Sequence, residues 1–393
     1  MDLVQWGRRV SHVKRFLEIW VADPNFRRDV LDSPATCTAQ RNVAVDLEAI
    51  RVLWDPKCAA QLTRNDSVQD VISKRWPQVQ DYLDYRHIRA MVLRRAREAG
   101  KPVDERFAAW RERQLARLER ELIPGSYNAS AHPIFAAELS NGCSVGCWFC
   151  GFDADKLDRH FESTPGNSKL WTECLTVLRH LCGATASATG LLYWATDPFD
   201  NPGYETFCED FYQAFGQYPR TTTALASFQL QRAHRFIVLA ESKGSYDNRF
   251  SILSLSALQR IHEAFTAEEL AHVDLILLNQ ESAQKKLRTG RANSADLPKR
   301  LSEQLLDNRP GQTIASVSGF LLNMVRRSVS LITPCGTTEA SSKGYFTLED
   351  RSFNNSGDLE RAIETMIEMH MPMTSLESEK RTATPARRDT LWR

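Results

Sequence analysis

Three closely spaced cysteines follow directly on a buried apolar segment, and this arrangement constrains the chain more than any other feature. The segment PIFAAELS, residues 133–140, is predicted to be a buried strand, and it runs into the loop NGCSVGCWFCG with Cys143, Cys147 and Cys150. Thiolates are the usual protein ligands of iron–sulfur clusters. Three of them leave one iron of a cubane free to chelate a small molecule through its amine and carboxylate. The spacing therefore predicts one [4Fe–4S] cluster bound by these cysteines.

A structural zinc site is the main alternative interpretation of this loop. Structural zinc requires four ligands, usually in two separated pairs. The sequence contains no second CxxC or His pair, and the next cysteine along the chain is Cys174. The nine cysteines are odd in number and unevenly spaced, which does not indicate a disulfide framework.

Residues 1 to about 122 are predicted to form a helical N-terminal domain. Apolar side chains recur from Val4 to Trp20 at steps of three and four residues, or sums of them, which is typical of an amphipathic helix. Asp23 followed by Pro24 predicts a second helix, because Asp is a favoured N-cap and Pro a favoured first helical residue. Further helices are expected at 46–54, at 68–99 with a kink near Pro77, and at 104–122, and residues 123–132 have the composition of a linker.

One stretch of this region is strongly basic. Between Arg86 and Arg120 there are eleven Lys and Arg residues against five Asp and Glu. Two interpretations stay open, a solvated helical face or a docking surface for an acidic peptide.

After residue 132 short apolar runs alternate with helical segments. This alternation predicts a parallel sheet, and six or more such units indicate a full or partial (β/α) barrel. We expect an α/β fold with a partial (β/α)6 barrel over 133–345, and a C-terminal extension over 346–393 whose polar tail from about 374 is disordered. After 133–140 the expected strands are 191–196, 221–226, 250–255, 273–278, 314–320 and 329–333, and the helices between them include 168–182, 203–215, 228–241 and 256–265.

Charge and hydropathy exclude several classes of partner. The net charge is +1, so the whole chain lacks the electrostatic signature of a nucleic-acid-binding protein. The N-terminus has no apolar core of a signal peptide, and no apolar run is long enough to span a membrane. A cytoplasmic protein without nucleic-acid or membrane partners is expected.

The motif Cys143-x3-Cys147-x2-Cys150 after the first strand of a β/α region resembles the radical S-adenosylmethionine (SAM) superfamily. Phe149, directly before the third cysteine, matches an aromatic residue that lies near the adenine of SAM in that superfamily. The resemblance implies one [4Fe–4S] cluster and SAM as cofactors, with the cluster donating an electron to SAM to release a 5′-deoxyadenosyl radical. The cofactors carry this chemistry, and the protein supplies binding and orientation.

A narrower resemblance spans most of the chain. The segments FLEIWVADPNFRRDVL, ELSNGCSVGCWFCG, YWATDPFDNP and SLITPC, with a later Lys343-Gly344-Tyr345, are similar to proteusin-type radical SAM epimerases, which act on ribosomally made precursor peptides. The first segment also resembles Nif11-like leader peptides. The resemblance implies a precursor peptide with a leader and an external, flavodoxin- or ferredoxin-like electron donor as partners. The N-terminal domain is expected to bind the leader, with a structural cap on the barrel as the alternative.

The resemblance also points to residues that contact SAM. The superfamily places a polar motif, often Gly-Gly-Glu, after its second strand, where this chain has Thr196 and Asp197 instead. A helix-capping role for Asp197 is the alternative. On the fourth strand, Arg249 suits a carboxylate. Ser254 suits a ribose hydroxyl. Ser251 and Ser254 point to opposite faces of a strand, so only one of them can point inward, and Ser254 is preferred because it lies closer to the end of the strand.

Cys335 is a candidate catalytic residue. It follows the expected strand VSLIT and is the only cysteine after Cys208, so no second cluster can form in this region. The predicted strand end places its side chain at the mouth of a barrel, where barrel sites lie. A buried structural cysteine is the alternative.

These residues and the resemblance together predict a peptide epimerase. The deoxyadenosyl radical removes the Cα hydrogen of an L-residue, and the Cys335 thiol returns a hydrogen atom from the opposite face to give a D-residue. A radical SAM enzyme that cross-links peptides would not need Cys335, and it is the first alternative. A non-catalytic iron–sulfur or zinc-binding module is the alternative from another class.

Overall fold

The computed structural model describes residues 3–33, 38–39, 41–60, 72, 74–122, 131–293, 303–307, 309, 311–337 and 341–373 of the 393-residue chain. Contacts divide the chain into two compact units. The first combines Met1–Val92, Thr222–Ser242 and Tyr246–Lys285, and the second combines Leu93–Thr221, Lys243–Ser245 and Lys286–Arg393. Most of the predicted linker and the predicted disordered tail lie outside the described residues.

The first two helices of the first unit follow the sequence signals. α1 (Leu3–Ala22) is followed at once by α2 (Pro24–Asp32), and the Asp23 side chain caps α2 by accepting hydrogen bonds from its first backbone amides. The apolar faces of both helices meet at Phe16 and Phe26, whose rings lie 5.7 Å apart. These contacts form part of a buried core of the first unit.

The next helices differ from the expectation. The predicted helix at 46–54 is only the short 3-10 helix η1 (Arg51–Leu53), and α4 (Pro56–Ala60) follows it. Of the predicted helix at 68–99, residues 68–71 and 73 lie outside the described residues, residues 72, 74 and 75 are helical, and after a break at Trp76 the long helix α6 (Pro77–Ala99) begins at its proline. Proline favours the first helical position because it has no backbone N–H to donate.

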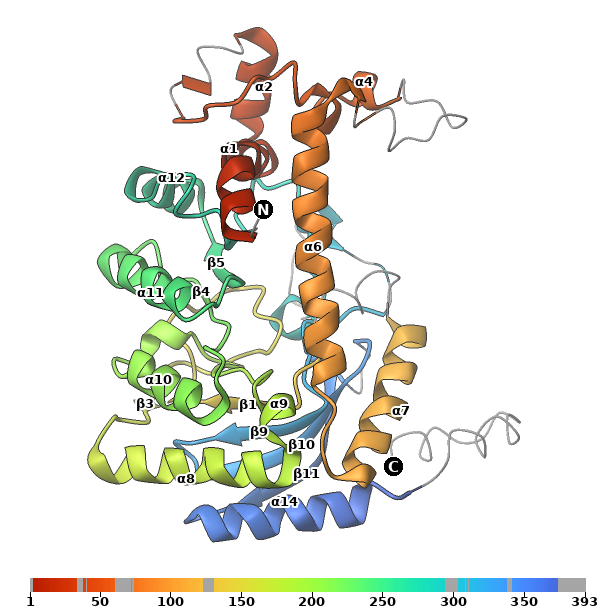
Figure 1. The fold of residues 1–393 in the computed structure, drawn as a ribbon, viewed down its shortest axis with the longest axis vertical. Coiled ribbons are helices and arrows are strands. Elements are labelled where there is room, and N and C mark those ends of the chain that lie inside the picture. The colour runs from red at the N-terminus through yellow and green to blue at the C-terminus, as the bar shows by residue number, and fades with distance from the viewer. Residues whose placement is uncertain are drawn as a thin grey trace, which may run out of the picture. The chain divides into compact units, whose positions relative to one another are not determined.

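A small parallel sheet completes the first unit. Its strand order is β4 (Thr222–Thr223), β5 (Asn248–Ile252) and β6 (Val273–Leu277). α11 (Leu230–Ser242) connects β4 to β5, and α12 (Leu255–Ala264) follows β5 and packs against it (Figure 1). Strands and helices alternate here as the sequence predicts.

A four-stranded mixed sheet organises the second unit. Its order is β1 (Phe135–Glu138), β9 (Gly319–Asn323), β10 (Ser328–Pro334) and β11 (Tyr345–Ser352). β1 and β9 are parallel, and Glu138 pairs in register with Asn323. β10 is antiparallel to both of its neighbours, so the predicted parallel alternation ends at β9.

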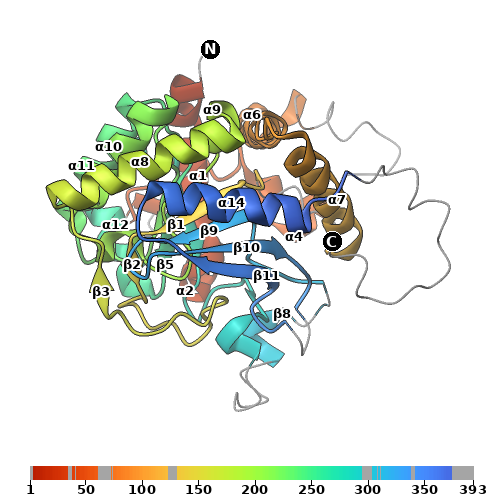
Figure 2. The ribbon, with the colours of Figure 1, turned by 90° about the horizontal axis from the view of Figure 1, so that it is seen from below.

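Helices cover one face of this sheet. α8 (Pro165–Cys182) and α14 (Ser356–His370) lie side by side, and α14 packs on β10 and β11 (Figure 2). The second unit also contains α7 (Glu105–Glu121), α9 (Ala184–Ser187), α10 (Tyr204–Phe215), the 3-10 helices η3 (Pro198–Asp200) and η4 (Gly290–Asn293), and the strand pairs β2 (Ser140–Asn141) with β3 (Arg159–His160) and β7 (Lys286–Leu287) with β8 (Leu306–Asp307).

The predicted α/β class is confirmed, whereas the barrel stays a prediction. The strands of the described residues form four separate sheets and no closed barrel. On the side of β1 away from β9, a single parallel bridge joins Ala136 to Leu191, the first residue of the predicted second strand. The carboxyl ends of β1, of β9 and of the segment after Leu191 consequently lie at one edge.

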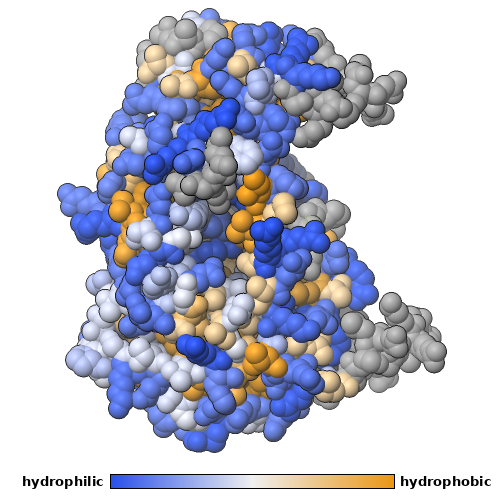
Figure 3. Space-filling model, in the orientation of Figure 1, coloured by the Kyte–Doolittle hydropathy of each residue, from blue (hydrophilic) through white to orange (hydrophobic). Residues whose placement is uncertain are grey.

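No helix in the described ranges combines the length and apolar character needed to cross a membrane. On the face shown in Figure 3, hydrophilic residues predominate and hydrophobic ones form small separate patches.

Candidate cofactor site

The three-cysteine loop begins where β1 ends and folds back on itself. The amide of Cys143 donates a 2.9 Å hydrogen bond to the carbonyl of Asp155, which closes the loop at its base. Gly142 has a φ of +83°, and a Cβ there would lie 2.3 Å from the carbonyl oxygen of Lys156. Only glycine fits this position, because any side chain would strain the backbone and collide with the returning chain.

The donor set of the loop fits an iron–sulfur cluster. Cys143, Cys147 and Cys150 are half-buried free thiols. The amide of Ala154 donates a 3.4 Å hydrogen bond to Cys150 Sγ, and the amide of Val145 donates to the Cys143 thiol. Hydrogen bonds to ligating sulfurs are among the factors that tune such clusters.

The thiols of Cys143 and Cys147 carry raised pKa values. The pKa of Cys143 is raised to about 12 and that of Cys147 to about 11, mainly by burial and in smaller part by the nearby Asp197 carboxylate. The Cys143 and Cys147 thiols therefore hold their protons at neutral pH, and ligation of iron by their sulfurs would require the release of these protons.

No three Cys, His, Asp or Glu side chains of the described residues gather closely enough to share one metal ion. The thiolates of a cubane bind three different irons, so they do not have to surround one ion. The chemistry of the donor set and its amide hydrogen bonds are what fit the cluster.

Arg291 fastens the outer side of this loop. Its guanidinium donates to the carbonyls of Cys147, at 3.1 Å, and of Ala154, and it pairs with Asp153 at 3.0 Å. Its own amide donates to the carbonyl of Cys150 at 2.9 Å. The positive charge also lowers the pKa of Cys147, against the dominant effect of burial. Arg291 was not among the predicted site residues, because nothing in the local sequence relates it to a loop about 140 residues earlier.

We expect Arg291→Gln to weaken cluster retention. Glutamine removes the charge and the forked donor, and losses of outer contacts of this kind typically cost about 10- to 100-fold in metal affinity. Iron and sulfide content after desalting, together with the visible absorbance of the reconstituted protein, measure the effect. Arg309→Gln is the matched control, since Arg309 is exposed and pairs with Asp307. Equal iron retention in both variants would contradict the role of Arg291.

Thr196 and Asp197, which were predicted to contact SAM, lie close to the cysteine loop. Asp197 is buried and accepts the amide of Phe199 at 2.9 Å as the N-cap of η3, so the capping interpretation describes a contact that it makes. The same carboxylate acts electrostatically on Cys143 and Cys147. Thr196 is half-buried beside it. Asp200, which was not predicted, ties this segment to the loop by accepting the amide of Ser144 at 2.9 Å.

The remaining predicted SAM contacts fall in different places. Phe149 is half-buried in the loop, with Lys286 Nζ 5.6 Å from its ring centroid. Arg249 lies on β5 of the first compact unit. Ser254 lies beyond the end of β5, where its hydroxyl caps α12 by accepting the amide of Ala257 at 3.1 Å. The expected strand position of Ser254 is therefore wrong, because a Ser before a helical run is a favoured N-cap.

Cys335 directly follows β10. Its side chain is only 2% exposed, and its Sγ lies 3.0 Å from Ser341 Oγ. Burial raises the pKa of the thiol, and the Ser341 hydroxyl and the Arg117 charge oppose this only in part. The S–H bond therefore stays intact at neutral pH. Cys335 does not line the pocket beside the cysteine loop, although Pro334 before it pairs with the pocket residue Tyr345.

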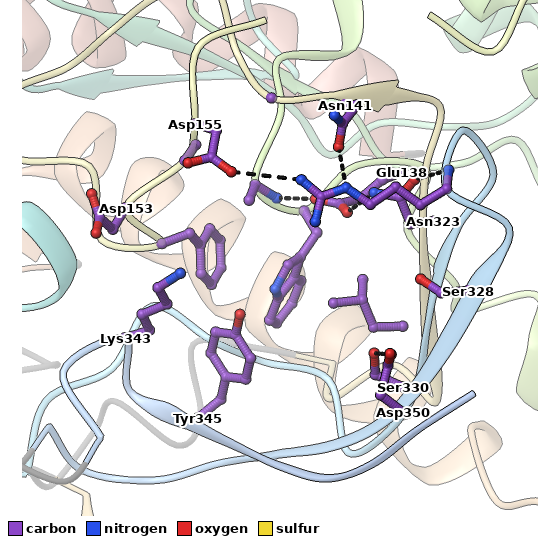
Figure 4. A pocket seen from close by; sticks show the side chains of 17 residues that line it. Glu138, Asn141, Asp153, Asp155, Asn323, Ser328, Ser330, Lys343, Tyr345 and Asp350 are labelled. Carbon is purple, nitrogen blue, oxygen red and sulfur yellow. Dashed lines mark hydrogen bonds and ion pairs between the residues drawn. The ribbon is translucent and has the colours of Figure 1, made fainter. Parts of the chain in front are cut away.

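A pocket of about 370 Å³ opens beside the cysteine loop, where the parallel strands end (Figure 4). Glu138, the last residue of β1, is 9% exposed. Its carboxylate accepts hydrogen bonds from the amide of Ala195, at 2.9 Å, and from Asn323 Nδ2, at 2.8 Å. Glu138 thus connects the ends of three parallel segments, and burial raises its pKa.

Aromatic rings and charged groups form the rest of this pocket. Phe152 and Trp194 stack with ring centroids 4.4 Å apart, and Tyr345 meets both edge to face. Charged side chains from loops and strands surround them; these include Asp153, Asp155, Arg326, Lys343 and Asp350. Asp153 and Asp155 follow the cysteine motif directly in sequence, whereas Arg326, Lys343 and Asp350 are far from it along the chain. Glu138 could not be recognised as a site residue because it lies within an apolar strand.

The fold and the site define a mixed α/β protein with a three-cysteine loop at the carboxyl end of a parallel strand. No family model and no solved structure matches the chain. The chain belongs to the same family as the uncharacterized protein y4wI of Sinorhizobium fredii (strain NBRC 101917 / NGR234). The two are 36% identical over 372 residues, which cover 93% of this chain and 71% of that relative.

Proposed function

We propose that the protein is a radical SAM enzyme that epimerises residues of a ribosomally made precursor peptide. The observation that carries the proposal is the loop of three half-buried thiols at the carboxyl end of β1, beside a pocket to which three parallel segments contribute. In β/α barrels the carboxyl ends of the strands hold the active site. A partial (β/α)6 barrel of the radical SAM kind is part of this proposal.

Different residues of the chain have different proposed roles. Cys143, Cys147 and Cys150 bind the cluster, and Arg291 fixes their loop. When bound, a [4Fe–4S] cluster and SAM together supply the deoxyadenosyl radical that removes a Cα hydrogen atom. Phe149, Thr196, Asp197, Arg249 and Ser254 are proposed to contact SAM.

Cys335 is proposed to complete the epimerisation. Its protonated thiol holds a hydrogen atom at Sγ, and donating that atom to the far face of the substrate Cα inverts the centre. The S–H bond breaks, a C–H bond forms, and a thiyl radical remains on Cys335. An external one-electron reductant and a proton restore the thiol. A raised pKa suits this role, because a thiolate has no hydrogen atom to give.

The proposed partners are a precursor peptide with a leader and a flavodoxin- or ferredoxin-like donor, in the cytoplasm. The basic stretch from Arg86 to Arg120 supports leader binding less than its composition suggests. Arg111, Arg113 and Arg117 are buried, and Arg117 donates to the carbonyl of Pro334. Leader binding by the N-terminal helices therefore rests on the Nif11-like segment.

Reconstitution tests the enzyme class directly. The protein, loaded anaerobically with iron and sulfide, should release 5′-deoxyadenosine from SAM in the presence of dithionite. A non-catalytic binding module would release none. Co-expression with a small precursor encoded beside the gene, followed by chiral amino-acid analysis, then separates an epimerase from a cross-linking enzyme, because cross-linking removes two hydrogens from the product.

A further inference from the structure

The two faces of the four-stranded sheet in the second unit differ in character. Phe320, Leu322 and Val329 alternate onto one face and are fully buried. Their neighbours Asn323 and Ser328 point to the other face, as side chains alternate along a strand. That second face is the floor of the pocket in Figure 4.

On this second face the strand register aligns polar side chains in two rows, with the apolar Leu321 among them. Leu321 on β9 pairs with Ser330 on β10, and Ser330 pairs with Asp350 on β11. One row nearer the cysteine loop, Glu138 pairs with Asn323, and Asn323 with Ser328. These residues all line the pocket, and we call this floor the polar trough.

Glu138 forms the inner end of the polar trough. Each of its two carboxylate oxygens accepts one hydrogen bond, so each keeps capacity for another donor. The partner Asn323 is itself oriented, because its Oδ1 accepts the amide of Arg326 at 2.8 Å. The inner end therefore presents a fixed, buried acceptor to a ligand that brings an N–H group.

Asp350 forms the outer end of the polar trough. It is exposed on the edge strand β11, and Ser330 Oγ donates to its Oδ1 at 2.5 Å. In the described part of the chain no cation pairs with it, and the neighbouring Arg351 pairs with Glu349 instead. The outer end is thus an acidic group open to a basic ligand.

We propose that the polar trough binds an extended segment of the substrate peptide, with a basic side chain at Asp350. β1 and β11 are three strand spacings apart, about 14 Å, which an extended peptide covers with about four residues. A backbone N–H of the peptide donates to Glu138, next to the cysteine loop, and the outer residues select by charge. This inference rests on the proposed action on peptides and adds a substrate preference to it.

A charge reversal at the outer end tests the proposal. The probe is a pool of synthetic octapeptides, randomised at every position, incubated with the full-length protein, recovered with it and sequenced by mass spectrometry. The wild-type protein should enrich Lys and Arg over Asp and Glu by about two- to fivefold, the size of an exposed ion pair. Asp350→Lys should invert the preference. Glu364→Lys makes the same charge change on α14, at a site outside the pocket, and should leave it unchanged.

Two outcomes would overturn the polar trough as a peptide site. One is a wild-type protein that enriches no peptide, and the other is an unchanged charge preference in Asp350→Lys. The selection requires no cluster and no turnover, so it is independent of the proposed reaction. Charge-selective peptide binding without SAM cleavage would refute the proposed function alone, and SAM cleavage without peptide selection would refute the trough alone.

Discussion

Replacing Cys143, Cys147 and Cys150 together by Ala should abolish both the brown colour of the reconstituted protein and all cleavage of SAM. These thiols are the proposed iron ligands, and alanine offers no donor atom in their place. The fold should persist, because backbone bonds close the loop, such as that from the Cys143 amide to the carbonyl of Asp155. Iron content, visible absorbance and 5′-deoxyadenosine release measure the loss, and circular dichroism checks the fold.

A single replacement elsewhere provides the control for this experiment. Cys174 is buried in α8 and has no proposed part in the site, so Cys174→Ala should keep the cluster and the cleavage of SAM. If the triple variant still released 5′-deoxyadenosine, the three-cysteine loop would not be the cluster site and the proposed enzyme class would be wrong.

The elements that could be predicted are those with local signals. Asp23 and Asp104 each precede a helix, and both cap one in the structure. The apolar run 133–140 contains β1, and the expected helix at 203–215 corresponds to α10 within a residue. In each case capping chemistry or hydrophobic periodicity within a short window determines the outcome.

The elements that could not be predicted depend on contacts distant in sequence. β10 continues the alternating pattern of apolar strands, yet it pairs antiparallel with β9, and β11 was not expected as a strand. Strand direction depends on how the connection closes, and a short turn between β9 and β10 permits only the antiparallel pairing. The barrel was inferred from alternation alone, which says nothing about such a hairpin.

The same limit applies to the site. The cysteine spacing is a local pattern and could be read directly from the sequence. Arg291 and Glu138 act through partners far along the chain, Cys147 for the first and Ala195 and Asn323 for the second. The basic stretch shows the converse case. In sequence Arg111, Arg113 and Arg117 have the pattern of charges on an exposed helix face, but in the fold they are buried.

Cys335→Ala should separate the two halves of the proposed reaction. The variant should keep its cluster, release 5′-deoxyadenosine and abstract the Cα hydrogen, because Cys335 lies outside the three-cysteine loop. Without a thiol it cannot return hydrogen to the far face, so D-residues should fall to background. In deuterated water the wild-type thiol exchanges its proton, and each epimerised residue should gain one deuterium at Cα. The variant should lose this label.

A second variant distinguishes hydrogen donation from a structural role of the buried side chain. Cys335→Ser keeps a small polar group within reach of the Ser341 hydroxyl, which lies 3.0 Å from the native sulfur. Because serine is similar in size and polarity to cysteine, this variant should fold normally. Its O–H bond is too strong to give up a hydrogen atom to a carbon radical, so the variant should also fail to epimerise. Chiral analysis and mass spectrometry of the co-expressed peptide measure both variants. Deuterium uptake with full epimerisation in either variant would assign the donor to another group, whereas a wild-type product lighter by two hydrogens would identify the enzyme as a cross-linker, for which Cys335 is dispensable.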